Sequence, residues 1–501
     1  MRRVLARLLA IAVLCACAAA LPAHAEEEDE DDEELREKLT EREDKRRPLE
    51  PWTLDVFGHP LTLGGEYEIE LIGLRSDVAE EAAPDDDRVF LEQGIELEAF
   101  YTLGKPLSLF AQFKVAMEED LRSHAGEEIS AAYVERGEMW LASEDIGGSG
   151  VSFDVGHLDF EDDRRWWWDD ELDAARVGWE VGDVEVQVAL AYEIASSRSD
   201  QSFVDPEQER VLRWIGEASW DFAESHSLQL FLLHQDDHSP SEQLGESVPV
   251  EREDDSDARL TWLGGRATGL ADLGPRGYLG YWLDAALVRG RDRELEFGDE
   301  VDGRVALEEV TRRDVHGWAL DVGVDWLLPL ALEPRLFAGY AYRSGDATSG
   351  GDDRAFRQTN LQENEAGFGG VERFNSYGLL LQPELSNLGI VTLGAGIALF
   401  RSSSLDLVYH HYRLDEPAED LRDSLLQAQL DGRHRELGHG VDLVLAVEEW
   451  ERFEFDVALA ALRTSNAFGI GDDDPPGDPD PEERGGRRWI VGAFVAVRYA
   501  F

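Results

Sequence analysis

Cysteine is almost absent from this chain of 501 residues, and its only two copies, Cys15 and Cys17, lie near the N-terminus. Beyond them the sequence offers no disulfide framework, no thiolate nucleophile and no cysteine metal site. No run of 18 apolar residues occurs either, which excludes a transmembrane helix. Positive charge is scarce, because 107 acids stand against 47 lysines and arginines and give a formal net charge of −60. This acidic excess excludes nucleic acid as a partner.

The N-terminus has the pattern of a secretory signal peptide. Three arginines within the first seven residues precede an apolar run from Leu8 to Leu21 that is too short to span a bilayer. Ala23-His24-Ala25 then forms a small-x-small cleavage site, so we expect residues 1–25 to be removed. Leu14 to Cys17 also forms a loose lipobox, and lipidation of Cys17 is the alternative to cleavage after Ala25.

Acidic residues dominate the segment that follows. Residues 26–34 are nine consecutive acids, and residues 35–47 carry mixed charges. Such a segment cannot bury enough apolar surface to fold alone, so residues 26–52 are expected to be a disordered periplasmic tail. The alternative is a tether for a basic periplasmic secretion partner. The remaining residues, 53–501, are expected to form one domain.

The last 13 residues alternate between apolar and mixed positions. A period of two indicates a strand with one apolar face. A strand this long and apolar would aggregate in water unless it closed a barrel and its apolar face met lipid. The pattern resembles the terminal strand of bacterial outer-membrane barrels, whose last aromatic, here Phe501, is read by the barrel-assembly machinery. The apolar positions are Trp489, Val491, Ala493, Val495, Val497, Tyr499 and Phe501.

Loop lengths predict an all-β fold: a transmembrane antiparallel up-and-down β-barrel of about 18 strands. Long polar connections alternate with tight turns along the chain, as expected when one rim faces outside and the other faces the periplasm. The long connections are 73–90, 118–128, 159–171, 196–210, 236–255, 290–312, 344–387, 414–437 and 464–486. Strands are expected to begin near Leu61, Leu91, Leu107, Ile129, Gly150, Leu172, Val184, Val211, His226, Ser256, Gly277, Arg313, Pro334, Leu388, Ser403, Gly438, Arg452 and Arg487.

The two faces of the expected strands differ in polarity. In the first strand Leu63, Tyr67 and Ile69 alternate with Glu66 and Glu68. Because a charge costs a few kcal/mol on the lipid face, the charged face must line a wet lumen, and a barrel of this size would enclose an aqueous channel. Aromatics near strand ends suit the interfacial girdles, although any single one could be a core residue. They are Trp140, Trp179, Trp220, Trp262, Tyr281, Trp326 and Trp489.

Two blocks of sequence resemble the alginate-export family of outer-membrane proteins. The stronger runs from Arg354 to Asn364, continues through Gly370 to Phe374 and Pro383 to Leu388, and ends with Leu407 to Arg413. The other comprises Gly156-His157-Leu158 and the segment from Arg164 to Arg176. His157 stands where the family usually has another basic residue. The resemblance covers residues from about 61 to 501.

The resemblance implies a barrel that passes an anionic uronic-acid polymer through an arginine-lined constriction. A guanidinium gives a carboxylate a planar, bidentate and permanently charged partner. The matching residues are Arg354, Arg357 and Arg373 after the thirteenth strand, and Arg164 and Arg165 after the fifth. Face parity adds Lys114, Arg176, Arg213, Arg259, Arg335, Arg343 and Arg498. For each residue the alternative is a solvated loop charge or half of a lumenal ion pair.

The sequence therefore predicts a bacterial outer-membrane channel that exports an alginate-like polyuronate by facilitated diffusion, in contact with lipid and lipopolysaccharide. A general or sugar-acid porin is the alternative, and a barrel-embedded hydrolase is a weaker one. His410 and His411 point to opposite faces of a strand and cannot easily share a ligand, and Ser402 to Ser404 lie in a short turn. We expect no catalytic set, no metal and no cofactor.

Overall fold

The computed structural model describes residues 52–76, 87–104, 107–122, 130–239, 243–346, 351–367, 370, 374–422, 424–426, 430–450, 452–468 and 489–501. The expected signal peptide, nearly all of the acidic tail and Arg373 lie outside these ranges. Among the described residues, no helix has both the length and the apolar character needed to cross a membrane.

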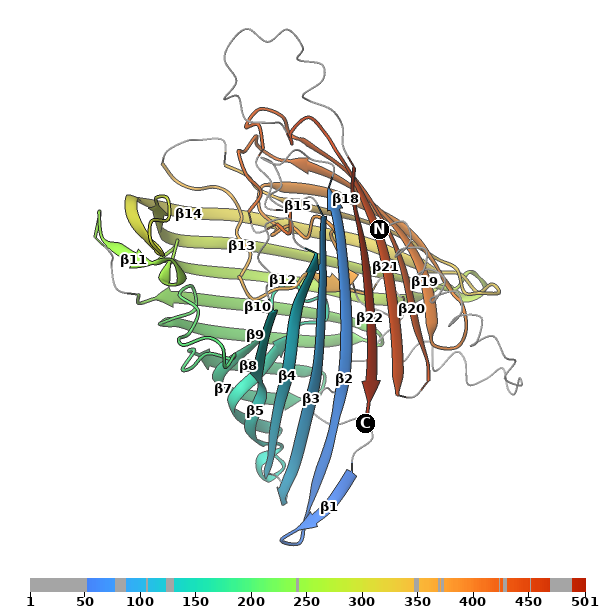
Figure 1. Ribbon diagram of the computed structural model, residues 1–501. Helices are drawn as coiled ribbons and strands as arrows, with labels where there is room; N and C mark the ends of the chain where they lie inside the picture. The colour runs from blue at the N-terminus through green and yellow to red at the C-terminus, as the bar shows by residue number, and fades with distance from the viewer. Residues whose placement is uncertain are drawn as a thin grey trace.

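Eighteen antiparallel strands form a closed barrel (Figure 1). The sheet contains 20 strands, of which β1 (Trp52–Val56) and β11 (Ser247–Pro249) are additions at its rims. Each of the others pairs with its neighbours in the sequence, and β2 pairs with β22 to close the ring. Their bounds are β2 His59–Ser76, β3 Asp87–Gly104, β4 Leu107–Arg122, β5 Ser130–Ser143, β6 Val151–Glu161, β7 Asp169–Val181, β8 Val184–Ala191, β9 Val211–Ala223, β10 His226–Asp237, β12 Arg259–Asp272, β13 Tyr278–Phe297, β14 Arg304–Leu327, β15 Arg335–Arg343, β18 Leu388–Ala398, β19 Ser403–Leu414, β20 Glu436–Trp450, β21 Phe453–Thr464 and β22 Trp489–Ala500.

The predicted fold class is confirmed, and each expected strand has a counterpart in the barrel. The longest connections all lie on one rim, which is the extracellular one, and the tightest turns all lie on the other, periplasmic rim. One expected loop is wrong. The segment 290–312 is mostly paired, because β13 and β14 continue as a hairpin with a connection of only 298–303. Strand β11 pairs with the projecting part of β14.

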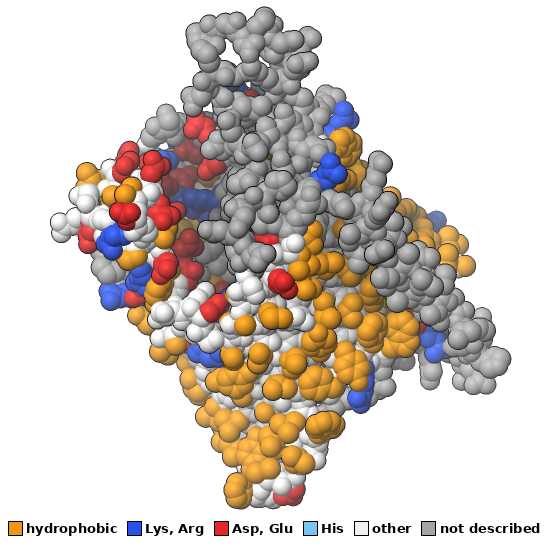
Figure 2. All heavy atoms as spheres, in the orientation of Figure 1, with side chains coloured by type: hydrophobic (Ala, Val, Ile, Leu, Met, Phe, Trp, Pro, Cys, Tyr) orange, Lys and Arg blue, Asp and Glu red, His pale blue; other side chains and the backbone are white. Residues whose placement is uncertain are grey.

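The outer surface of the barrel is apolar. Leu97, Val188 and Leu287 expose more than half of their area on the face that alternation turns outward. Figure 2 shows hydrophobic side chains gathered across the outside of the strands. Because an apolar band of this kind is stable only against hydrocarbon, it marks the membrane-spanning zone.

Two of the expected girdle tryptophans point inward instead. Trp179, Trp220 and Trp489 are about half exposed on the outer face, as predicted. Trp140 and Trp262 are buried on the inner face. Trp262 contacts protein that fills part of the lumen, whereas Trp140 stacks on Phe110 of the neighbouring strand β4. The expectation of an aqueous channel without a packed core is wrong for this part of the lumen.

Candidate transport pathway

Three extracellular connections fold into the barrel and form what we call the plug: residues 162–168 after β6, and the described residues of 351–387 after β15 and of 415–435 after β19. Trp166, Trp167 and Phe356 are each no more than 2% exposed. The ring of Trp167 stacks on Phe231 of β10 at 4.9 Å between centroids. Burying these rings removes large apolar areas from water, and it explains why aromatics occur in otherwise polar loops.

Hydrogen bonds join the plug segments to one another. The Gln358 side chain donates to the Trp166 carbonyl at 3.2 Å, and the backbone N–H of Asn364 donates to the Arg165 carbonyl at 2.8 Å. The Ser424 hydroxyl donates to the Leu381 carbonyl at 2.9 Å, which ties the third segment to the second. Two short strands, β16 (Glu365–Ala366) and β17 (Phe374–Asn375), pair within the second segment. The plug therefore has its own hydrogen-bonded structure.

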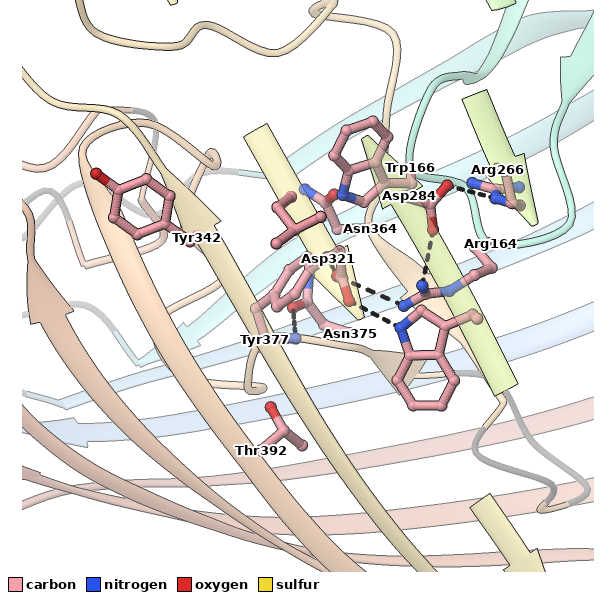
Figure 3. Close-up of polar contacts among 12 residues, drawn as sticks. Arg164, Trp166, Arg266, Asp284, Asp321, Tyr342, Asn364, Asn375, Tyr377 and Thr392 are labelled. Atoms are coloured by element: carbon pink, nitrogen blue, oxygen red, sulfur yellow. Dashed lines mark hydrogen bonds and ion pairs between the residues drawn. The ribbon is translucent and has the colours of Figure 1, made fainter. Parts of the chain in front are cut away.

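A buried chain of ion pairs attaches the first plug segment to the wall. Arg164 lies between two wall carboxylates, at 2.9 Å from Asp284 and 3.6 Å from Asp321 (Figure 3). Arg266 of β12 binds the other oxygen of Asp284 at 2.6 Å and also contacts Asp162 of the plug. Arg266 and Asp284 are fully buried. Every charge in this chain has an opposite partner, which burial requires.

The same network reaches the second plug segment. The Tyr377 hydroxyl contacts Asp321 Oδ2, and Trp282 donates its ring N–H to Asp321 Oδ1 at 2.7 Å. The guanidinium of Arg164 lies over the Trp282 ring at 4.7 Å. One wall carboxylate, Asp321, thus holds both segments.

Arg357 links the second plug segment to the projecting hairpin. Its guanidinium contacts Asp292, and it lies 2.8 Å from Glu294 and 2.6 Å from Asp353. Burial alone would lower the pKa of Arg357, but the carboxylates of Asp292 and Asp353 raise that pKa above its ordinary value. The backbone carbonyl of Arg357 also accepts a hydrogen bond of 2.7 Å from Trp262. The residue holds the plug in place and has little exposed surface.

Other residues expected along the pathway are also paired with carboxylates. The pairs are Arg165 with Glu161, Asp169 and Glu365; Arg176 with Asp154; Arg335 with Asp406; Lys114 with Glu68 and Glu92; and Arg498 with Glu68 and Asp456. Their distances run from 2.6 Å to 3.7 Å. The acids therefore neutralise most of the inward positive charge at short range.

Arg213 and Arg343 differ from this pattern. Both are buried on the inner face, and among the described residues neither has a carboxylate within ion-pair distance. Arg343 donates to the carbonyls of Leu320 and Tyr342 at 2.6 Å and 2.7 Å, and it lies over the Trp166 ring at 4.7 Å. Its Nε and Nη2 atoms have no hydrogen-bond partner in the described part of the chain.

Arg259 is the one residue whose expected direction is wrong. It lies on the outer face, with its side chain 63% exposed, and pairs with Asp236 at 2.6 Å. The expectation treated Trp262 as a lipid-facing girdle residue, which turned Arg259 inward. Because Trp262 packs against the plug, the parity of β12 is reversed and Arg266 is the inward arginine. Sequence reasoning missed Arg266 for the same reason.

The loop arginines also separate by position. Arg354 is exposed, and the described residues place no carboxylate within ion-pair distance of it. Arg373 lies outside the described residues, so its place in the pathway stays a prediction.

The inner face of β2, β3, β4 and β21 forms what we call the acidic wall. Its carboxylates are partly exposed, whereas the inner faces of β12 to β15 are largely buried. Three basic residues, Lys114, Arg198 and Arg498, form ion pairs with acids of this wall. The wall comprises Glu66, Glu68, Glu70, Glu92, Glu96, Glu98, Glu118, Glu454 and Asp456.

A cavity of about 580 Å³ opens near the short turns of β5 to β8. Its lining combines carboxylates, amide and hydroxyl groups with one guanidinium, that of Arg176. Asp154 lies 3.0 Å from this guanidinium. The cavity gives the periplasmic end of the lumen a hydrated recess beside Arg176.

Comparison with known proteins decides the family. The family model described as alginate export matches residues 61–473. The chain belongs to the alginate-export family. As a family member with a closed 18-stranded barrel, it is located in the bacterial outer membrane.

Two relatives of this alginate-export family member are named alginate production protein AlgE. The one from Pseudomonas aeruginosa is 26% identical over 326 residues, and the one from Pseudomonas syringae pv. tomato is 23% identical over 343 residues. Each match covers 64% of this chain and only 65% of the relative. Among solved structures, Pseudomonas aeruginosa OccK8 (OprE) has a similar fold, with a TM-score of 0.51 and 10% identity over 88% of this chain and 98% of that one.

Proposed function

We propose that this protein exports an anionic exopolysaccharide, an alginate-like polyuronate, across the outer membrane by facilitated diffusion and without covalent chemistry. The observation that carries the proposal is the family match across residues 61–473. The plug supports it further. Its loops fill part of the lumen and are attached to the wall by ion pairs, and such an obstruction suits gated passage of a polymer better than free diffusion of small solutes.

In the proposed pathway, the polymer exchanges its carboxylates for those of the protein. Arg176 offers a first contact at the periplasmic cavity, and Arg354 offers one at the outer side of the plug. Between them, a uronate can take the place of an aspartate or glutamate on a guanidinium where the displaced carboxylate reaches water or a counter-ion that compensates its charge. Several shallow sites favour passage, because a polymer must leave each site as well as enter it.

Planar-bilayer recording tests this proposal. Polyuronate added to the periplasmic side is expected to block the small-ion current, and neutral dextran of equal length is expected to block it less. Arg354→Gln should weaken the polyuronate block, whereas Arg259→Gln on the outer face should leave it unchanged. Equal block by both polymers, or equal effects of the two substitutions, would contradict the proposal.

A porin for small solutes is the second candidate, and the acidic wall is the observation that favours it. A lumen lined by partly exposed carboxylates attracts small cations more readily than a polyanion. The same recording separates the two functions, because a porin would conduct steadily and would not respond to polyuronate.

Three partners complete the proposal. The barrel-assembly machinery would recognise the terminal strand through Phe501, and the apolar belt would contact lipid and lipopolysaccharide. Periplasmic secretion proteins would deliver the polymer to the short-turn rim. Pull-down from cells with and without residues 26–52 would show whether the acidic segment recruits such a protein.

A further inference from the structure

Two histidines face each other on the outer surface of neighbouring strands. His411 of β19 and His439 of β20 are directly opposite in the register, and their rings are 5.0 Å apart at an interplanar angle of 20°. Directly opposed residues on one face of an antiparallel pair lie close enough to share a ligand. His410 points to the other face, as expected, so the partner of His411 is distant in sequence and adjacent in space.

A carboxylate and a phenol complete the cluster. Glu436 contacts Nε2 of His411, and Tyr409 Oη lies 2.8 Å from Nδ1 of His439. One ligand atom from each of His411, Glu436 and His439 lies within 4.8 Å of the others. When Nδ1–H of His439 donates to the Tyr409 hydroxyl, Nε2 of the same ring keeps its lone pair free for a metal. A metal-binding histidine usually makes such a hydrogen bond through its other ring nitrogen.

We propose that His411, His439 and Glu436 bind a divalent transition metal of the zinc class on the outer surface of the barrel. Two imidazoles and one carboxylate, with a fourth position left to water, are a known zinc ligand set. Ligands of tetrahedral zinc lie about 3.3 Å apart at the usual bond lengths. Small side-chain rotations bring the three donors to that spacing, and the partial exposure of Glu436 leaves room for them.

Two other groups of donors in the described residues fit a zinc ion less well. In the group of His157, Asp173 and Glu193, Arg136 already holds Asp173 at 2.8 Å. The third group contains aspartates alone and lacks imidazole, which zinc prefers over carboxylate-only sites. Of the three groups that the described ranges contain, the cluster on β19 and β20 combines two imidazoles with an accessible carboxylate.

Basic neighbours limit the affinity of the proposed site. Arg413 pairs in register with Glu436, and Arg463 of β21 pairs in register with His439. Their charges oppose a cation. Arg463→Gln is therefore expected to tighten metal binding by roughly 1.5- to 5-fold.

The site lies where the third plug segment leaves the wall. The connection 415–435 joins the extracellular ends of β19 and β20, and its Leu421, Leu426 and Leu430 are buried in the plug core. A metal that bridges the two strands would hold both ends of this connection together. The site would therefore stabilise the base of one plug segment from outside the lumen.

Zinc titration of the detergent-solubilised protein tests the proposal. Millimolar magnesium is present throughout, because it occupies carboxylate-only sites and leaves imidazole sites to zinc. One magnesium-resistant zinc per chain is expected. His411→Ala or His439→Ala should weaken it at least about tenfold, and Tyr409→Phe about tenfold. Cobalt should give a visible absorption band that both histidine variants lose.

The matched control is His238→Ala, which removes an exposed histidine paired with Asp236 on another part of the barrel. It should bind zinc as the unsubstituted protein does. Heat-modifiable mobility in gels shows that each variant is folded. Unchanged magnesium-resistant affinity in the folded H411A/H439A variant, or no such binding in the unsubstituted protein, would overturn the proposal.

Discussion

Asp284 holds two arginines that come from different parts of the molecule. One carboxylate oxygen binds Arg266 of the wall at 2.6 Å, and the other binds Arg164 of the plug at 2.9 Å. None of its surface is exposed. A buried carboxylate of this kind is tolerated only while its partners neutralise it, and removal of one partner leaves an uncompensated buried charge.

Asp284→Asn is therefore expected to lower the free energy of unfolding by about 3–5 kcal/mol. The control is Asp236→Asn, since Asp236 pairs with the exposed Arg259 and its loss should cost less than about 1 kcal/mol. Denaturant unfolding of both variants in the same detergent measures the difference. Equal losses would mean that the buried network contributes no more to stability than an exposed ion pair does.

At the scale of elements, Arg357 attaches the second plug segment to β13. Three carboxylates surround its guanidinium, and two of them, Asp292 and Glu294, belong to β13. Arg354, three residues earlier, is exposed. Arg357 thus adds a charged attachment to the one that Tyr377 makes with Asp321, and Arg354 is presented to solvent.

Arg357→Gln should release this segment from β13. We expect faster cleavage between residues 351 and 387 by protease added outside, together with a larger and noisier single-channel current, because the plug would leave its place more often. Arg354→Gln is the matched control and should leave cleavage unchanged. A slow, unaltered cleavage rate for Arg357→Gln would show that the aromatic contacts alone hold the segment.

The strands could be predicted from the sequence because each rests on a local pattern. Alternation in residues such as Leu63 to Ile69, and the change from tight turns to long polar loops, located all of the barrel strands. The plug could not be placed in this way. Whether Trp262 faces lipid or a plug depends on residues almost 100 positions away, and no local period records that contact. The pairing of Arg357 with Asp292 was hidden for the same reason.

At the scale of the whole molecule, charge is divided between two sides of the lumen. Arg164, Arg266 and Arg357 of the plug and of β12 form closed ion pairs, whereas the acidic wall keeps its carboxylates partly exposed. Exposed charges act over about a Debye length, 8–10 Å at physiological salt. Small ions that pass the plug along this wall therefore meet a negative field.

We accordingly expect the small-ion current to be selective for cations, although the proposed cargo is an anion. The reversal potential in a potassium chloride gradient measures this selectivity. Combined substitution of Glu92, Glu96 and Glu98 by glutamine should move that potential toward zero, and selectivity should weaken at high salt. Anion selectivity of the unsubstituted channel would show that ions do not follow the acidic wall.

The ring of Phe501 packs against Gly65 of β2, where the glycine has no side chain to obstruct it. Phe501 exchanges backbone hydrogen bonds with Gly65 at 2.9 Å and 3.2 Å, and a Cβ on Gly65 would lie 3.0 Å from the Phe501 ring and 2.2 Å from the Glu96 carbonyl oxygen. Gly65→Val is expected to reduce the folded, heat-modifiable fraction in membranes, whereas Gly73→Val, where the nearest atom is 3.9 Å away, should not.

The pairing of β2 with β22, which closes the barrel, also constrains the order of assembly during biogenesis. The first strand of the barrel, β2, lacks the partner of one edge until β22 arrives, so that edge must be shielded during secretion. A product that lacks β22 would leave the edges of β2 and β21 unpaired. In hydrocarbon no water can satisfy the backbone N–H and C=O groups of those edges. Truncated copies should therefore be discarded by periplasmic proteases, and the bilayer should receive complete cylinders alone.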